Sequence, residues 1–293
     1  MNSTATNAAM VTLLLLTASR IVVFNTFFEK FRKLENNKPK FETSSKTSDG
    51  HSLSLLLSLA DTKNGERRVR CGGSLVSGRY VLTAAQCVAP SYIRGRKLTH
   101  VTLGDWRLST DPDCSDNVCA PERLSVLVEE VVVHPGFNTP SRLNNDIALI
   151  RLQSEVNFNR FIQPICLPPT NFGSSEVSVN QTVVAVGWGD TVTGDASDVL
   201  KEVRLNIAEP SVCKRVYSSN FQLNGAHMCI GGGLEDTCFG DSGGPVMKLN
   251  KDQRSYVLAI TSFGAPNCGT PGQPSVYTSV AHFNDWIRQS MKS

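Results

Sequence analysis

Short apolar runs separated by turn-forming residues are the sequence feature that most limits how this chain can fold. Such runs occupy 53–59, 80–83, 124–133, 147–152, 182–186 and 256–262, and glycine, proline, asparagine and aspartate lie between them. Short strands with frequent turns are typical of antiparallel sandwiches and barrels. Near the end, apolar residues recur at helical spacing, from Val280 through Phe283 and Ile287 to Met291. We therefore predict an all-β chain closed by one C-terminal α-helix.

Size and charge narrow the possible functions. The chain has 293 residues, of which 40% are hydrophobic, and this suffices for one large domain or two packed halves. The net charge of +3 is small for that length. A chain without a strong basic patch has no electrostatic footprint for nucleic acid or an anionic membrane, so we expect neither as a partner.

The N-terminal part has the composition of a targeting segment. The apolar run 8–18 is too short to span a membrane and suits the core of a signal peptide, but no Lys or Arg precedes it and a second apolar stretch follows at 21–28. We assign 1–24 to a signal peptide, with a signal anchor as the alternative, and 25–50 to a polar linker or pro-segment. Nine scattered cysteines without paired CxxC spacing favour disulfides in an oxidising compartment. The prediction is a secreted, extracellular protein without stable membrane association.

Three segments carry the chemistry: Cys71–Leu75 followed by Leu82–Cys87, then Asn145–Leu149, then Gly240–Pro245. In this order they resemble the chymotrypsin/trypsin family of serine proteases, over about 41–290. The resemblance implies two antiparallel Greek-key β-barrels, about 41–155 and 165–278, with a cleft between them and a C-terminal helix. Segments around Cys114, Cys119 and Cys166 resemble the clip-domain proteases of arthropods and their non-catalytic homologues.

The resemblance assigns the catalytic roles residue by residue. Ser242 matches the nucleophile, Asp146 the acid that orients the base, and the N–H groups of Gly240 and Ser242 the oxyanion hole. At position 86, where the family has histidine, this chain has Gln86. An amide has no titratable lone pair near neutral pH, so Gln86 cannot take and return the serine proton. We therefore expect little or no peptidase activity.

Two further positions depart from the family. Zymogens of the family are cut before Ile-Val-Gly-Gly, and the new amino group inserts beside the aspartate that matches Asp241; here the segment is Phe41-Glu-Thr-Ser. Asp236 matches the aspartate that selects Arg or Lys in trypsin-like members. Ser275 replaces a glycine that those members usually have, so its hydroxymethyl group is expected to crowd the pocket and hydrogen-bond Asp236. The edge strand that pairs with substrate backbone matches Ser262, Phe263 and Gly264.

The resemblance also implies cysteine pairs and raises the question of calcium. It pairs Cys71 with Cys87, Cys213 with Cys229 and Cys238 with Cys268, while Cys114 and Cys119 are near enough in sequence to close a small loop. Cys166 is left as a buried thiol, an intermolecular bridge, or a sign that the gene model lacks its true 5′ end. We expect no cofactor, although related proteases often bind calcium in the loop at 105–130. We expect a solvated acidic loop here; calcium is the alternative, with Asp105, Asp113, Asp116 and Glu129 or Glu130 as candidate ligands.

These observations favour a secreted serine-protease homologue that binds a protein component of an extracellular protease cascade, in arthropod immunity. The alternative is an active trypsin-like endopeptidase that cleaves after Arg or Lys, with a substrate histidine or water in place of the missing base. The first predicts no hydrolysis, and the second predicts cleavage confined to peptides with histidine beside the scissile bond.

Overall fold

The computed structural model describes residues 58–63, 66–69, 71–93, 96–115, 118–173, 176–191, 194–249 and 255–292. The predicted signal segment, the linker at 25–50, the activation segment at Phe41 and most of the expected strand 53–59 lie outside these residues. The described residues up to Cys114 and from Cys119 onward belong to one compact unit. Both large sheets lie in that unit.

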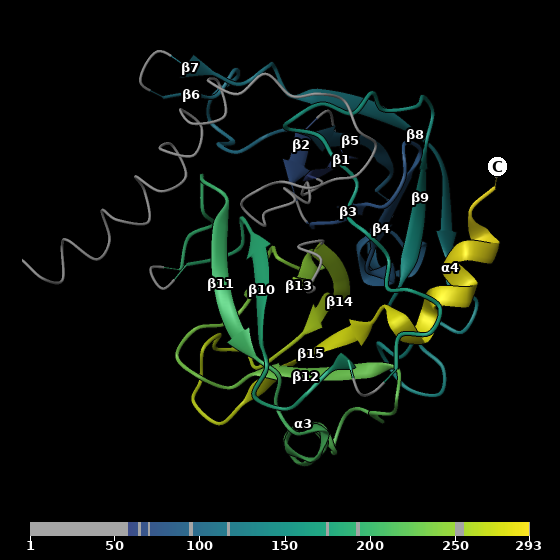
Figure 1. Cartoon of the computed structure of the whole chain (residues 1–293), viewed down its shortest axis with the longest axis vertical. Coiled ribbons are helices and arrows are strands. Elements are labelled where there is room, and N and C mark those ends of the chain that lie inside the picture. The colour runs from purple at the N-terminus through teal and green to yellow at the C-terminus, as the bar shows by residue number, and fades with distance from the viewer. Residues whose placement is uncertain are drawn as a thin grey trace, which may run out of the picture. The chain divides into compact units, whose positions relative to one another are not determined.

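The first sheet has seven antiparallel strands in the order β2-β1-β5-β8-β9-β4-β3 (Figure 1). Its core is formed by inward-facing apolar residues such as Val81, Val101 and Ile150, which are fully buried. The predicted runs 80–83 and 124–133 coincide with β4 and β8. The strands are β1 (Ser58–Lys63), β2 (Glu66–Val69), β3 (Ser74–Leu75), β4 (Tyr80–Thr83), β5 (Leu98–Leu103), β8 (Leu124–Val133) and β9 (Ala148–Leu152).

The second sheet has six antiparallel strands in the order β11-β10-β13-β14-β15-β12. Its core is centred on Ala185, Val246, Ala259 and Tyr277, all fully buried. Two curled antiparallel half-barrels of this kind define the trypsin-like fold, which confirms the predicted class. The strands are β10 (Thr182–Gly187), β11 (Lys201–Asn206), β12 (His227–Gly231), β13 (Pro245–Leu249), β14 (Ser255–Phe263) and β15 (Pro274–Ser279).

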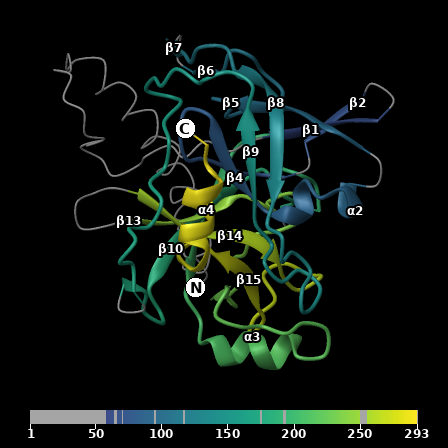
Figure 2. The same cartoon turned by 90° about the vertical axis from the view of Figure 1, so that its right-hand side faces the viewer.

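The predicted C-terminal helix is present as α4 (Asn284–Ser290), entered through the 3-10 turn η3 (Ala281–Phe283). Ile287 is fully buried and belongs to a cluster that includes Tyr80 and Leu82 of β4 and Val257 of β14. Figure 2 shows α4 in front of these strands. The helix therefore packs against strands of both sheets through its apolar stripe.

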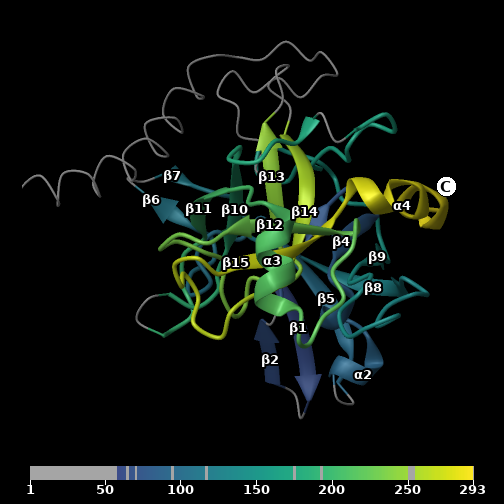
Figure 3. The same ribbon diagram turned by 90° about the horizontal axis from the view of Figure 1, so that it is seen from below.

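Three short helical segments were outside the all-β prediction: η1 (Ala85–Cys87), α2 (Pro90–Ile93) and α3 (Pro210–Tyr217). Helix α3 packs against β12 and β15 (Figure 3) and buries Cys213 and Tyr217, which lie four residues apart. Pro210 in its first turn is a helix-start signal. One apolar pair at helical spacing is too weak a pattern to predict a helix of this length among strands.

Four disulfides are present: Cys71–Cys87, Cys114–Cys119, Cys213–Cys229 and Cys238–Cys268. Cys114–Cys119 closes the hairpin of β6 (Cys114–Ser115) and β7 (Val118–Cys119). Cys166 is half-buried and forms no disulfide with the other cysteines, all of which the structure describes. No helix among the described residues is long and apolar enough to cross a membrane.

Arg123 pairs with two aspartates in the loop at 105–130, where calcium binding is the alternative to a solvated loop. Arg123 contacts Asp105 Oδ2 at 3.1 Å and Asp111 Oδ2 at 3.2 Å. Asp105 Oδ1 is buried without a hydrogen-bond partner among the described residues, and burial raises the pKa of this carboxyl. Asp113 instead accepts the backbone N–H groups of Trp106 and Arg107.

Two further candidate calcium ligands, Glu129 and Glu130, form ion pairs with other residues. Glu129 pairs with Arg79 at 2.7 Å and Arg151 at 2.6 Å, and Glu130 pairs with Lys292 at 2.7 Å. Asp116 lies outside the described residues, and within those residues no three His, Cys, Asp or Glu side chains gather as metal ligands would. The solvated acidic loop, with calcium as the alternative, stays a prediction.

Arg123→Gln is expected to destabilise the fold by about 1–2 kcal/mol, because it leaves the buried Asp105 carboxylate without its cation; the partly exposed arginine reduces the loss below that of a fully buried pair. Denaturant unfolding measures the change. The matched control is Arg204→Gln, which breaks an exposed pair with Glu202 and should cost less than about 0.5 kcal/mol. Equal effects of the two substitutions would show that Asp105 does not depend on Arg123.

Candidate active site

Asp146 is the buried centre at which the two sheets meet. It directly precedes Ile147 and β9 in the first sheet and is completely inaccessible to solvent. Its Oδ2 accepts the hydroxyl of Ser262, on β14 of the second sheet, at 2.5 Å. Its backbone carbonyl accepts the hydroxyl of Thr278, on β15, at 2.9 Å. Because both partners belong to the other sheet, Asp146 is a site residue only when the two sheets are packed together.

Gln86 lies on η1 and donates three hydrogen bonds, two to Asp146 and one to Ser262. Its backbone N–H donates to Asp146 Oδ1 at 2.8 Å, and its Nε2 donates to Asp146 Oδ2 at 2.8 Å and to the Ser262 carbonyl at 2.6 Å. Both partners of Nε2 are acceptor oxygens, so the network determines which way the amide faces. Both amide protons of Gln86 are thus used in hydrogen bonds to Asp146 and Ser262. Gln86 orients Asp146 but supplies no base.

The electrostatics of Asp146 follow from its surroundings. Burial raises its pKa to about 6, although the hydroxyl of Ser262 and the N–H groups of Gln86 and Ala85 oppose that rise. Among the described residues, no cationic side chain forms an ion pair with Asp146. An amide stabilises the ionised carboxylate less than an imidazolium does, because it brings a dipole instead of a full charge.

The raised pKa of Asp146 predicts a pH-dependent stability of defined sign. The folded state holds the proton up to about pH 6 and the unfolded state only to about pH 4, so the contribution of this group is fully present at low pH and is lost as pH rises through 6. We expect the free energy of unfolding, relative to that of Asp146→Asn, to fall by about 2–3 kcal/mol between pH 4 and pH 7. Chemical unfolding across that range measures it, and a difference independent of pH would contradict it.

Ser242 lies in a turn that requires glycine on both sides. Gly240 and Gly243 have φ of 99° and 80°, in the left-handed region. A Cβ at 240 would lie 3.0 Å from the Gly189 Cα, and one at 243 would lie 2.3 Å from Thr83 Oγ1. Among the described residues, none accepts the N–H of Gly240 or Ser242 or hydrogen-bonds the Ser242 hydroxyl. Neither N–H group is therefore engaged by a described residue, as the oxyanion hole that the resemblance implies would require.

Asp241 packs its carboxylate against the backbone of a neighbouring strand end. It accepts the N–H groups of Gly189 and Cys238, each at 2.8 Å, and burial raises its pKa. A Cβ at Gly187 or Gly189 would come within 1.8 Å or 2.5 Å of the carboxylate, so only glycine fits there. The Phe41 segment, whose amino group the resemblance would bring here, lies outside the described residues.

Asp236 heads a group of polar residues that we call the Asp236 cluster: Asp236, Thr237, Ser275 and Tyr277. Asp236 Oδ2 accepts the Ser275 hydroxyl at 2.7 Å, and Oδ1 accepts the Thr237 N–H at 2.8 Å and the Tyr277 hydroxyl at 3.3 Å. The Thr237 and Tyr277 hydroxyls are 2.8 Å apart. Burial raises the pKa of Asp236 and, well above its usual value, that of Tyr277.

Thr237 and Tyr277 are members of this cluster that the motifs do not indicate. Tyr277 lies two residues after Ser275 on β15, so both side chains point to the same face of the strand. That alternation is the signal in the sequence by which Tyr277 could have been found. Phe263, expected on the edge strand, stacks on Phe221 with ring centroids 4.2 Å apart.

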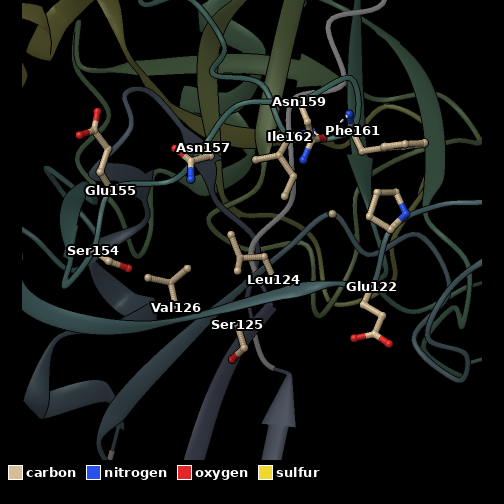
Figure 4. Close-up of a pocket in the computed structure, with 12 residues that line it drawn as sticks. Glu122, Leu124, Ser125, Val126, Ser154, Glu155, Asn157, Asn159, Phe161 and Ile162 are labelled. Carbon is tan, nitrogen blue, oxygen red and sulfur yellow. Dashed lines mark hydrogen bonds between the residues drawn. The ribbon is translucent and has the colours of Figure 1, made fainter.

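A separate pocket of about 360 Å³ lies in the first barrel (Figure 4). Leu124, Val126 and Ile162 line it, and Glu122 and Glu155 lie on opposite sides. None of the residues with a predicted catalytic or specificity role lines this pocket. The candidate active site is therefore the arrangement around Asp146 and Ser242.

Comparison with known proteins agrees with this geometry. The model of the family described as Trypsin matches residues 44–287, so the chain belongs to the trypsin family of serine proteases. It is 40% identical over 231 residues to CLIP domain-containing serine protease B4 of Anopheles gambiae, which covers 78% of this chain and 64% of that protein. It is 38% identical over 229 residues to Phenoloxidase-activating factor 1 of Holotrichia diomphalia, covering 76% and 62%.

A solved structure adds the fold-level match. The crystal structure of the Drosophila Grass clip serine protease of the Toll pathway superposes with a TM-score of 0.70 at 32% identity, covering 87% of this chain and 73% of that one. The chain spans slightly less than two thirds of the length of the two curated relatives. The resemblance to clip-domain proteases of arthropod cascades is thus confirmed.

Proposed function

We propose that this chain is a secreted serine-protease homologue without peptidase activity, which binds a protein partner in an extracellular protease cascade. The observation that carries the proposal is the use of both Gln86 amide protons, toward Asp146 at 2.8 Å and the Ser262 carbonyl at 2.6 Å. The side chain in the position of the base keeps the site ordered but has no group that takes the Ser242 proton.

Two features support a binding role for the face near Ser242. The loop that leads to Ser242 exposes Leu234 and Phe239, with 83% and 63% of their surface accessible. Large apolar side chains at a surface are common anchors in protein interfaces. The printed names of relatives, a phenoloxidase-activating factor and a protease of the Toll pathway, point to proteolytic cascades as the setting.

The test is direct labelling of the nucleophile. The purified protein, cut after Lys40, is treated with a fluorophosphonate probe and with chromogenic Arg and Lys peptides, and Ser242→Ala serves as the blank. The proposal expects no labelling or hydrolysis above that blank. Hydrolysis that Ser242→Ala abolishes would overturn it.

The alternative function is an active trypsin-like endopeptidase that cleaves after Arg or Lys. It is favoured by one observation: within the described residues, the hydroxyl of Ser242 and the N–H groups of Gly240 and Ser242 are not engaged by the protein itself. A histidine in the substrate could then act as the base. Paired peptides with and without histidine beside the scissile bond distinguish the two functions, because only the alternative predicts cleavage of the histidine-containing member.

A further inference from the structure

Both oxygens of the Asp236 carboxylate accept hydrogen bonds from the protein itself. Ser275 donates to Oδ2, while the Thr237 N–H and the Tyr277 hydroxyl donate to Oδ1. A carboxylate offers about four acceptor positions. Oδ1 already accepts two donors, so no free acceptor position remains on that oxygen. A ligand that donates two parallel hydrogen bonds needs a free position on each oxygen.

The side chain of Ser275 also occupies space beside that carboxylate. Ser275 is buried on β15, where it pairs with Ile230 of β12. A Cβ at Gly264 would lie 2.2 Å from Ser275 Oγ and 3.1 Å from its Cβ. The hydroxymethyl group thus lies between Asp236 and the backbone of Gly264. A glycine at position 275 would leave this space open.

We propose that Ser275 is a specificity-determining residue that closes Asp236 to guanidinium and amidinium groups, so that a polypeptide bound here inserts an uncharged side chain instead of arginine. A guanidinium recognises a carboxylate through two parallel N–H···O bonds, which need one accessible acceptor on each oxygen. Forming them here would displace the Ser275 and Tyr277 hydroxyls from Asp236. Tyr277 would keep Thr237 as a partner at 2.8 Å, but the buried Ser275 hydroxyl would lose its hydrogen bond to Asp236, which is unfavourable. The inference rests on the proposed binding function and names the ligand class of that site.

The first experiment uses p-aminobenzamidine, a fluorescent amidinium that binds without any catalytic step. The natural chain, Ser275→Gly and Ser275→Ala are titrated, with Ser279→Gly as the matched control on the same strand. We expect Ser275→Gly to bind the probe roughly tenfold or more tightly than the natural chain. Ser275→Ala, which removes the hydroxyl but keeps the Cβ, should be intermediate, and Ser279→Gly should behave as the natural chain does.

Two results would overturn the proposal. One is a natural chain that binds p-aminobenzamidine as tightly as Ser275→Gly does, and the other is a folded Ser275→Gly that still does not bind it. Adding Asp236→Asn to Ser275→Gly should abolish the gained affinity, which locates the probe at this carboxylate. Thermal unfolding confirms that each variant is folded.

A second experiment tests the uncharged ligand itself. A Kunitz-type protease inhibitor is prepared with either Arg or Leu at its inserted residue, and the binding of each to the natural chain is measured by calorimetry. We expect the Leu form to bind the natural chain more tightly and the Arg form to bind Ser275→Gly more tightly. The opposite order on the natural chain would contradict the proposal. Peptide hydrolysis is recorded on the same samples, since hydrolysis would overturn the proposed function while leaving the Ser275 assignment standing.

Discussion

Gln86→His, combined with replacement of the four residues at 41–44 by Ile-Val-Gly-Gly, is expected to make Ser242 react with a fluorophosphonate on the order of 10³-fold or more faster than in the natural chain. The imidazole would accept the Ser242 proton while its other nitrogen donates to Asp146, as the Gln86 amide does now at 2.8 Å. Among the described residues, none accepts the N–H groups of Gly240 and Ser242, which are the expected oxyanion donors. Rates of covalent labelling measure the effect.

Three controls separate the contributions. Gln86→His alone shows how much depends on the base, and the replacement at 41–44 alone shows how much depends on the activation segment. Gln222→His adds a histidine at an exposed glutamine and should leave Ser242 unreactive. A natural chain that labels as fast as the repaired one would mean that another group activates Ser242.

Ile287→Ala is expected to lower the free energy of unfolding by about 2–5 kcal/mol. Ile287 is fully buried in the cluster that α4 shares with β4 and β14, so its truncation leaves a cavity where the helix contacts both sheets. Urea unfolding monitored by circular dichroism measures the loss. Gln289→Ala on the exposed side of the same helix should change stability by less than about 0.5 kcal/mol. A similar small change for both would show that α4 contributes little to the fold.

Loss of α4 packing is also expected to affect the candidate active site around Asp146 and Ser242. Ile147, which follows Asp146 directly, belongs to the same cluster as Ile287 and is fully buried. We therefore expect Ile287→Ala to reduce the labelling rate of the repaired Gln86→His protein as well as its stability. Unchanged labelling would show that the hydrogen bonds of Asp146 to Ser262 and to residue 86 position it without the packing of α4.

The positions of several strands and the functional group present at residue 86 could be read from the sequence. The runs 80–83, 124–133 and 182–186 become β4, β8 and β10 within one residue at each end, because alternating apolar residues and nearby turns are local signals. That residue 86 carries no titratable group can also be read from the sequence, since the inability of an amide to take a proton near neutral pH depends on its functional group and not on its surroundings.

Helix α3 and the ion pairs of Arg123 in the loop at 105–130 could not be predicted in this way. The helix is stabilised by contacts of Cys213 and Tyr217 with β12 and with β15, and β15 is far along the chain. Arg123 lies 18 residues from Asp105, and nothing in the local pattern indicates that the two side chains meet at 3.1 Å. Such contacts depend on how the strands are arranged, and local sequence carries little information about that.

Local periodicity in the sequence is enough to predict an all-β chain, and the resemblance to the trypsin family places Ser242 at the nucleophile position and Gln86 at the position of the histidine. The contacts that the substituted residues make depend on the tertiary structure. It turned both Gln86 amide protons toward acceptors, buried Asp146 so that its pKa rises to about 6, and placed the Ser275 hydroxyl 2.7 Å from Asp236. Each of these properties depends on side chains from distant segments, because burial and hydrogen-bond partners exist only once both sheets are packed together.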